Sequence, residues 1–331
     1  MKAETVPHQE ENNLNTDRKI PLILDGDPGH DDAIAWVLAA SDPRFEIKAI
    51  TAVAGNQTLA KVSENCRKIA ALLHLDIEVA KGREIPLIAD LMTGGDYHGE
   101  TGLDGAELPA PEHPYSSRSA VALMADVLRA SEDPVIIVAT GPQTNVAALL
   151  LAYPELKPKI RLVSIMGGGL RNGNWTSAAE FNILNDPEAA YILFHAGVPV
   201  LMCGLDVTEQ AMIYPAEWQT LRGLHNRVAD TVAAWLDFFS IKLKELGWEG
   251  VTLHDPCAVL ALSHPEIFTM KDCYVDVLLD GEYTRGLTMC DWNGRTGHAP
   301  NCRAVLGLDR EKFVSLLIEA CRGFGGGEEN A

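Results

Sequence analysis

The sequence predicts an α/β fold: a single domain with an open, mostly parallel sheet flanked by helices, and a few antiparallel strands near the C-terminus. Short apolar runs alternate along the whole chain with longer segments whose apolar residues recur at helical spacing. No linker rich in proline, glycine or serine divides the chain. We therefore expect one domain over residues 19–324, with flexible tails at 1–18 and 325–331.

Continuous apolar runs in the first half of the chain are typical of strands buried in a parallel sheet. They cover residues 20–24, 46–53, 77–80, 135–139 and 160–166. Helices are expected between them over 33–40, 58–73, 117–130 and 146–152, and Thr58 can cap the second. The segment 86–115 has no regular periodicity, and loops of that length in compact domains usually carry function.

The alternation continues in the second half of the chain. Asp186-Pro187 predicts the start of a helix that ends at His195, and a strand follows at 198–202. The remaining predicted helices cover 215–222, 227–246, a segment that starts at Pro256, and 310–321. The remaining strands cover 274–279, 286–290 and 304–307, and we expect them to form an antiparallel addition to the sheet.

Composition excludes several classes of protein. The net charge is −19 at pH 7, with 46 acidic against 27 basic residues, so we expect no nucleic-acid partner and no membrane partner. Hydrophobic residues make up 47% of the chain, which is enough for a large core, but no apolar run is long enough to span a bilayer. The seven cysteines show no paired C-x-x-C spacing, which indicates reduced thiols in a cytoplasmic protein.

An acidic turn, Asp25-Gly26-Asp27-Pro28-Gly29-His30-Asp31-Asp32, directly follows the first predicted strand. Ligands bind at this edge of an open parallel sheet, because the loops at the carboxyl ends of the strands converge there. Aspartates are also ordinary turn and helix-cap residues, which explains one or two of them. Four aspartates so close together repel one another unless a cation lies between them, and hard divalent cations take oxygen ligands. The turn therefore predicts a metal or catalytic site.

Further polar residues follow later predicted strands: Asn56, Thr140, a stretch from Asn174 to Asn182, and His254-Asp255. Each of them alone is an ordinary turn or capping residue. Together they predict one site with cation ligands, hydroxyl-binding amides and a titratable imidazole. The glycine run 167–169 lacks the spacing and the lysine of a P-loop, and its polar surroundings suit a neutral polyol instead.

These motifs resemble those of the inosine–uridine-preferring nucleoside hydrolase family. The similar segments occur in the same order: Asp25 to Ala33, Ala54-Gly55-Asn56, His98-Gly99-Glu100-Thr101-Gly102-Leu103, Thr140-Gly141-Pro142, Glu180-Phe181-Asn182 and His254-Asp255-Pro256. At Gly26 relatives often have a different small residue. The resemblance implies the family's fold, a bound Ca²⁺, and hydrolysis of the N-glycosidic bond of ribonucleosides to ribose and free base.

The same resemblance implies a role for each motif residue. The implied Ca²⁺ ligands are three carboxylates and one main-chain oxygen, those of Asp27, Asp32, Asp255 and Thr140, and Asp27 is also the implied general base. The residues implied to hold the ribose hydroxyls or the attacking water are Asp31, Asn56, Asn174, Glu180 and Asn182, with Met166 packed under the sugar. Negative charge near the ring and a grip on the hydroxyls stabilise an oxocarbenium-like transition state.

The leaving base must be protonated or stabilised, and His254 is the first candidate to donate a proton to it near neutral pH. His98, on the long loop, is the second candidate. Both motifs resemble those of relatives that cleave uridine, inosine or pyrimidine nucleosides. The helix before His254 is expected to offer Phe238, Lys242 and Leu246 to the base, which fits a strict pyrimidine preference less well. We expect uridine and cytidine as substrates, with inosine also accepted.

Alternatives stay open at this point. The enzyme could prefer purines or accept all bases. A magnesium-dependent phosphohydrolase of the haloacid dehalogenase type also has Asp-x-Asp after its first strand, with Asp25 as the nucleophile, but it does not require Asp31-Asp32 or His254-Asp255. A non-catalytic nucleoside- or ribose-binding protein could dispense with Asp27. The resemblance further implies a homo-tetramer or dimer.

Overall fold

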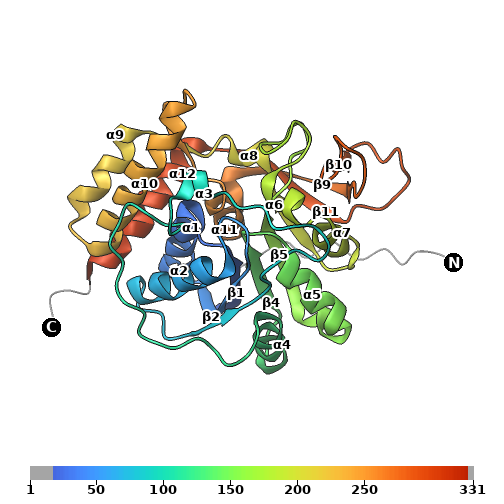
Figure 1. The fold of residues 1–331 in the computed structure, drawn as a ribbon, viewed down its shortest axis with the longest axis horizontal. Coiled ribbons are helices and arrows are strands. Elements are labelled where there is room, and N and C mark those ends of the chain that lie inside the picture. The colour runs from blue at the N-terminus through green and yellow to red at the C-terminus, as the bar shows by residue number, and fades with distance from the viewer. Residues whose placement is uncertain (1–17, 327–331) are drawn as a thin grey trace.

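A nine-stranded sheet with helices on both faces forms the centre of the computed structural model, which describes residues 18–326 (Figure 1). The strand order is β10-β9-β11-β6-β5-β4-β1-β2-β3. These strands are β1 (Ile20–Gly26), β2 (Phe45–Ala52), β3 (Glu78–Lys81), β4 (Val135–Ala139), β5 (Ile160–Met166), β6 (Val200–Cys203), β9 (Phe268–Val277), β10 (Thr288–Asp291) and β11 (Cys302–Leu308). A separate antiparallel pair is formed by β7 (Met212–Ile213) and β8 (Val251–Thr252).

The helices lie between the strands along the chain. They are α1 (His30–Ser41), α2 (Leu59–Leu72), α3 (Gly95–His98), α4 (Ala120–Ala130), α5 (Thr144–Ala152), α6 (Phe181–Asn185), α7 (Pro187–His195), α8 (Leu205–Thr208), α9 (Pro215–Trp218), α10 (Arg227–Glu245), α11 (Pro256–Ser263) and α12 (Arg310–Arg322). Short 3₁₀ helices are η1 (Pro154–Lys159), η2 (Gln219–Leu224), η3 (Pro265–Ile267) and η4 (Gly323–Gly326).

Side-chain oxygens cap several of these helices. Ser119, Asp186, Asn226 and Asp309 each accept a hydrogen bond from a backbone N–H in the first turn of α4, α7, α10 and α12. Thr58 is the N-cap residue of α2, as predicted, but its side chain makes no capping hydrogen bond.

The sheet changes its direction of growth at β1. This strand is parallel to β2 on one side and to β4 on the other. The chain adds β2 and β3 on the first side, and then crosses to add β4, β5 and β6 on the second. In open α/β sheets a ligand crevice forms at such a switch point, outside the carboxyl ends of the strands. The acidic turn follows β1 at this place.

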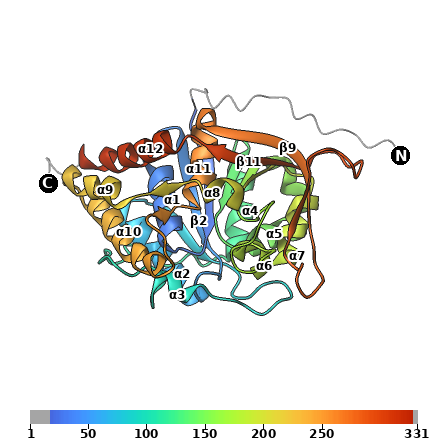
Figure 2. The same ribbon diagram turned by 90° about the horizontal axis from the view of Figure 1, so that it is seen from above.

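Two hydrophobic cores cover the two faces of the sheet. Neighbouring residues of a strand point to opposite faces, so Leu22 and Leu24 belong to one core and Ile23 to the other. Helices α1, α2, α10, α11 and α12 contribute to the first core, and α4, α5 and α7 to the second. Figure 2 shows α1, α10, α11 and α12 grouped on one side of the molecule and α5, α6 and α7 on the other.

The predicted α/β fold is confirmed, with one correction at the C-terminal strands. β9 is antiparallel to both of its neighbours, β10 and β11, as expected. β11, however, is parallel to β6 and lies between β6 and β9, so it continues the main sheet. β9 also begins at Phe268 rather than at residue 274. The direction of a strand depends on its pairing partner, which a local sequence pattern does not specify.

The shortest elements differ most from the predicted ones. α3, α6, α8, β7 and β8 are too short to show a period, and the sequence pattern predicted none of them. α1 begins at His30 rather than at residue 33, so Asp31 and Asp32 lie in its first turn. This position suits carboxylates, because the N-terminal end of a helix carries partial positive charge.

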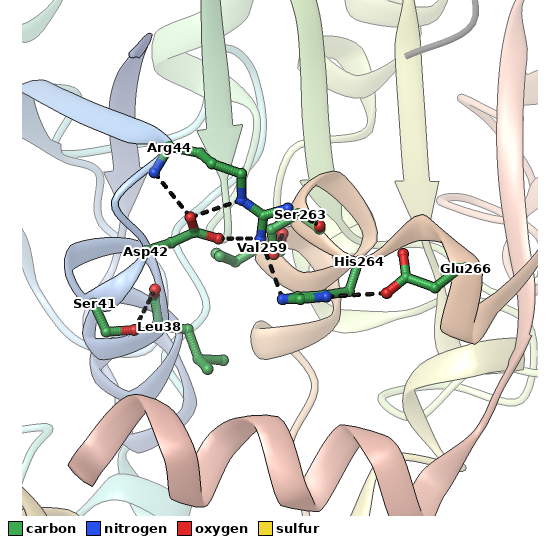
Figure 3. A network of polar contacts seen from close by, with 8 residues as sticks. All are labelled: Leu38, Ser41, Asp42, Arg44, Val259, Ser263, His264 and Glu266. Carbon is green, nitrogen blue, oxygen red and sulfur yellow. Dashed lines mark hydrogen bonds and ion pairs between the residues drawn. The ribbon is translucent and has the colours of Figure 1, made fainter. Parts of the chain in front are cut away.

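A network around Arg44 joins the C-terminal ends of α1 and α11 (Figure 3). The Arg44 guanidinium donates to both carboxylate oxygens of Asp42, at 2.8 and 2.6 Å, and to the main-chain oxygen of Ser263 at 2.5 Å. It also donates to Nε2 of His264 at 3.2 Å, which leaves His264 Nδ1–H to donate to Glu266 at 3.1 Å. Every charged group of the network therefore has a partner.

The remaining sequence expectations concern thiols, membrane spans and tails. All seven cysteines are free, and six of them are buried, Cys290 being half-buried. Within residues 18–326 no helix is long and apolar enough to cross a membrane. The tails expected at 1–18 and 325–331 lie outside the described residues except for Arg18, Gly325 and Gly326, and the two glycines belong to η4.

Candidate active site

The switch point of the sheet brings Asp32 and Thr140 into contact. Asp32 lies in the first turn of α1, directly after β1, and Thr140 directly follows β4. The Thr140 hydroxyl donates to Asp32 Oδ1 at 2.6 Å. The other carboxylate oxygen, Oδ2, accepts from the Gly29 N–H at 3.0 Å and from the Asn56 side-chain amide at 3.3 Å. Asn56 follows β2, so loops after three neighbouring strands meet here.

Asp27 is fully buried and only partly hydrogen-bonded. Its Oδ2 accepts from the Asn56 N–H at 2.6 Å, whereas Oδ1 has no hydrogen-bond partner within residues 18–326. Two glycines make room for this carboxylate: a Cβ at Gly55 would lie 2.1 Å from Oδ2, and a Cβ at Gly141 would lie 2.5 Å from Oδ1. A buried carboxylate oxygen without a partner is costly, so the site holds Asp27 ready for a ligand.

Three carboxylates form a compact cluster. Asp31, Asp32 and Asp255 are buried, and each offers an oxygen within 4.8 Å of the others. Asp255 comes from a distant part of the sequence, where it is the N-cap residue of α11. The resemblance groups Asp27 with Asp32 and Asp255, whereas this geometric cluster contains Asp31 and not Asp27.

The electrostatics of the cluster are those of a site that lacks positive charge of its own. Burial, and after it the charge of Asp32, raises the pKa of Asp31 to about 7. The same two causes raise the pKa of Asp27 well above its ordinary value, and burial together with the Asp31 charge raises that of Asp255. Burial also raises the pKa of Asp32. Clustered buried oxygens with an unpartnered Asp27 Oδ1 fit a divalent metal ion that takes oxygen ligands.

A cavity of about 390 Å³ borders the cluster. Most residues predicted for the site line it: Asp31, Asn56, His98, Thr140, Met166, Asn174, Glu180, Asn182, His254 and Asp255. Asp27 and Asp32 are fully buried and do not line it. None of the described lining residues is a lysine or an arginine, so the cavity suits a neutral ligand better than a phosphate ester.

Asn182 links the cluster to the glycine-rich loop. Its side-chain amide donates to the main-chain oxygens of Thr140, at 2.7 Å, and Met166, at 3.1 Å. Glu180 caps α6 and accepts from the N–H groups of Gly168, Asn182 and Ile183. Burial raises the Glu180 pKa to about 7 in spite of these bonds. The loop after β5 is thus fixed by buried polar contacts, which preorganises this wall of the cavity.

Two histidines line the cavity, His98 being buried and His254 half-buried. His254 Nδ1 lies 2.8 Å from the Thr208 hydroxyl, and burial lowers the His254 pKa to about 4. Burial and the neighbouring His30 and His254 lower the His98 pKa well below its ordinary value. Both rings are therefore neutral at pH 7, and each reaches the cavity as a neutral donor or acceptor rather than as an imidazolium.

The apolar wall of the cavity differs from the predicted one. Phe239, Leu243 and Leu246 line it, together with Trp248, so that Leu246 alone of the three expected wall residues is in place. Phe238 packs on the His30 ring instead, with ring centroids 5.4 Å apart. The prediction was one residue out of phase along α10, because neighbouring residues point in different directions on a helix.

Further lining residues carry no sequence signal that would have identified them, among them Tyr97, Trp175 and Glu209.

Asp25 is excluded as a nucleophile. It is fully buried, does not line the cavity, and accepts hydrogen bonds from Thr51 at 2.6 Å and Asn145 at 2.8 Å. The alternative of a haloacid dehalogenase-type phosphohydrolase is therefore wrong.

Known proteins with similar sequences and structures point to one family. Residues 22–315 match the family described as inosine-uridine preferring nucleoside hydrolase. A pyrimidine-specific ribonucleoside hydrolase RihA from Enterobacter sp. (strain 638) is 50% identical over 303 residues, which cover 91% of this chain and 97% of the relative.

Solved structures agree with this match. A purine-preferring ribonucleoside hydrolase from Gardnerella vaginalis superposes with a TM-score of 0.86 at 32% identity, over 92% of this chain and 99% of that one. A plant nucleoside hydrolase, PpNRh1, has a TM-score of 0.86 at 28% identity, with the same coverage of 92% and 99%. This chain therefore belongs to the inosine-uridine preferring nucleoside hydrolase family, as an enzyme of the nucleoside hydrolase class.

Proposed function

We propose that this chain hydrolyses the N-glycosidic bond of ribonucleosides, releasing ribose and the free base, with Ca²⁺ held by the aspartate cluster. The observation that carries the proposal is the buried cluster of Asp31, Asp32 and Asp255 at the edge of a cavity lined by amides and two neutral histidines. Family membership and 50% identity to a pyrimidine-specific ribonucleoside hydrolase support it.

The cluster and its neighbours would hold the ion. Asp31, Asp32 and Asp255 supply carboxylate oxygens, and the Thr140 main-chain oxygen and Asp27 complete the set. Hard oxygen donors of this kind suit Ca²⁺, which accepts six to eight ligands at flexible geometry. When bound there, Ca²⁺ would supply the positive charge that lowers the pKa of a nearby water.

Asp27 acts as the general base. The Asn56 N–H holds its Oδ2, so the unpartnered Oδ1 takes a proton from the attacking water. The water oxygen forms a bond to the anomeric carbon as the bond from that carbon to the base nitrogen breaks, and the bonding electrons leave with the base.

The side chains around the glycine-rich loop hold the sugar. Asn56, Asn174, Asn182 and Glu180 bring amide and carboxylate groups to the cavity surface, where they hydrogen-bond to the ribose hydroxyls. Met166 lines the same part of the cavity and packs under the sugar ring. Negative charge from the aspartates then stabilises the oxocarbenium-like transition state.

His254 and His98 contact the base. His254 Nδ1 lies 2.8 Å from the Thr208 hydroxyl, and in the tautomer in which this hydroxyl donates, the neutral ring presents Nε2–H to the leaving base and offsets its developing negative charge. Uridine and cytidine are the preferred substrates, with inosine accepted. The 50% identity to the pyrimidine-specific relative outweighs the 32% identity to the purine-preferring structure in this choice.

Release of base and reducing sugar from uridine, cytidine, inosine, adenosine and guanosine tests the proposal. Wild-type protein with Ca²⁺ should cleave uridine and cytidine fastest, and Asp27→Ala should cleave none. Asp42→Asn, which removes a carboxylate at the far end of α1, is the matched control and should stay within twofold of wild type. Tight nucleoside binding without any turnover would show a binding protein instead. Fastest cleavage of inosine or guanosine would reverse the base preference.

We also propose that residues 19–324 form one catalytic domain of a cytoplasmic homo-tetramer or dimer. Free thiols throughout the chain support the compartment, and the family resemblance supports the assembly. Light scattering on the purified protein measures the mass of the assembly directly, and a monomer would contradict it.

A further inference from the structure

A second imidazole lies behind the cavity wall, in contact with His98. His30 is fully buried, is the first residue of α1, and does not line the cavity. Its Nδ1 lies 3.0 Å from Nδ1 of His98, and its Nε2 lies 2.8 Å from the main-chain oxygen of Asp104. The two rings are stacked with centroids 5.3 Å apart, and both pack on Phe239 at 5.2 Å.

The partners of His30 determine where hydrogens lie. A carbonyl oxygen only accepts, so His30 Nε2 carries a hydrogen and donates it to Asp104. His98 Nδ1 has two contacts with residue 30: the His30 side-chain Nδ1 at 3.0 Å, and the His30 main-chain N–H, which donates to it at 3.3 Å. His98 Nδ1 is thereby engaged, and within residues 18–326 its Nε2 has no partner. Nε2 is the nitrogen that His98 offers to the cavity that it lines.

The surrounding loop is built to hold this pair of rings. A Cβ at Gly29 would lie 2.7 Å from His98 Nδ1, so only glycine lets the ring approach the start of α1. The Asp104 carboxylate accepts from the N–H groups of Glu100 and Thr101 and from the Thr101 hydroxyl, which fixes the turn that carries the Asp104 carbonyl. The Asp104 N–H in turn donates to the His98 main-chain oxygen at 3.3 Å.

We propose that His30 is a positioning residue, which fixes the orientation of the His98 ring so that only Nε2 faces the base of the bound nucleoside. This role rests on the proposed hydrolysis. His30 itself does not contact the substrate and acts only through His98. Phe239 packs against the His98 ring with the ring planes 36° apart, which restricts the ring's movement, and the contact with His30 prevents it from flipping.

A double-mutant cycle tests whether His30 acts through His98. His30→Phe keeps an aromatic ring between Phe238 and Phe239 and removes both side-chain hydrogen bonds, while the main-chain N–H of residue 30 stays beside His98 Nδ1. It should lower kcat for uridine by about tenfold to a hundredfold, with a smaller change in KM. In a His98→Ala background the same substitution should cost nothing further. Additive losses in the two backgrounds, or wild-type activity of His30→Phe, would refute the positioning role.

A second variant and a spectroscopic readout separate this role from a structural one. His30→Asn can still hydrogen-bond to the His98 ring and should recover part of the lost activity, whereas an equal loss in both variants would refute the role. Imidazole ¹⁵N spectra should show a His98 Nδ1 signal that shifts in His30→Phe, where only the main-chain N–H of residue 30 still reaches this nitrogen, and an unchanged signal would again refute it. If wild-type protein cleaves no nucleoside, the proposed function fails, yet the spectra still report on the His30–His98 contact.

Discussion

Helices α1 and α11 pack against each other, and their two ends have opposite electrostatic character. At the N-terminal ends, Asp31 and Asp255 are buried close to other carboxylates, and their pKa values are raised. At the C-terminal ends, the Arg44 guanidinium pairs with Asp42 and with the last turn of α11 (Figure 3). The same helix pair therefore stabilises the fold at one end and gives up stability for ligand binding at the other.

The largest effect is expected from Asp27→Asn, close to the N-terminal ends of α1 and α11. Loss of the general base should lower kcat by about 10² to 10⁴ at unchanged fold. Without added metal, the variant should also melt at a higher temperature than wild type, because one of several mutually repelling buried carboxyl groups is removed. Base release and thermal melting in the same buffer measure both quantities. Full activity in this variant would place the general base elsewhere.

The stability of the protein should depend on pH through Glu180, which lines the cavity. Burial raises its folded-state pKa to about 7 from an ordinary value of 4.5, so the unfolded chain ionises first as the pH rises. Stability should therefore fall between pH 4.5 and 7, by on the order of 3 kcal/mol, and stay level above. Urea unfolding of wild type and Glu180→Gln in EDTA, repeated across this pH range, tests this. The difference between their free energies of unfolding should change between pH 4.5 and 7, and a constant difference would contradict the prediction.

Metal removal should lower stability through the cluster and not through the Arg44 network. At a Ca²⁺ concentration of 100 times Kd, binding should stabilise the fold by about 2.7 kcal/mol, and EDTA should abolish that gain. Asp255→Asn should lose most of the Ca²⁺-dependent rise in Tm because it removes one clustered ligand. Arg44→Met should keep the full rise. A rise of equal size in Asp255→Asn and wild type would place the ion elsewhere.

The smallest effect is expected at the C-terminal ends of α1 and α11, where Arg44 lies. Arg44→Met removes hydrogen bonds to Asp42 and to the Ser263 carbonyl in a partly exposed network, so it should lower the free energy of unfolding by about 1–2 kcal/mol. Its kcat/KM for uridine should remain within twofold of wild type. A large loss of activity in this variant would show that the two ends of the helix pair are coupled.

Much of the site could be predicted from the sequence because its residues occur in short motifs at strand ends. Residues such as Asn56, Thr140 and Asp255 follow parallel strands or begin helices, and the switch point at β1 brings those segments together. The strand boundaries of β4 and β5 also agree with the predicted ones, since buried parallel strands read as continuous apolar runs.

What the sequence could not predict depends on the phase of a helix or on the pairing of distant strands. Phe239 rather than Phe238 faces the cavity, and a shift of one residue on α10 separates the two. His30 looked like part of the acidic turn, and its contact with His98 arises only because the long loop returns to the start of α1. The parallel pairing of β11 with β6 is likewise a tertiary choice.

The place of β11 has a consequence for how the chain is made. This strand is the last of the sheet to leave the ribosome, yet it sits between β6 and β9. Until Cys302–Leu308 emerges, the nascent chain exposes an unpaired edge on β6, and β9 and β10 have no sheet to join. Exposed strand edges recruit other chains, so early termination before residue 302 should yield insoluble fragments rather than a smaller enzyme.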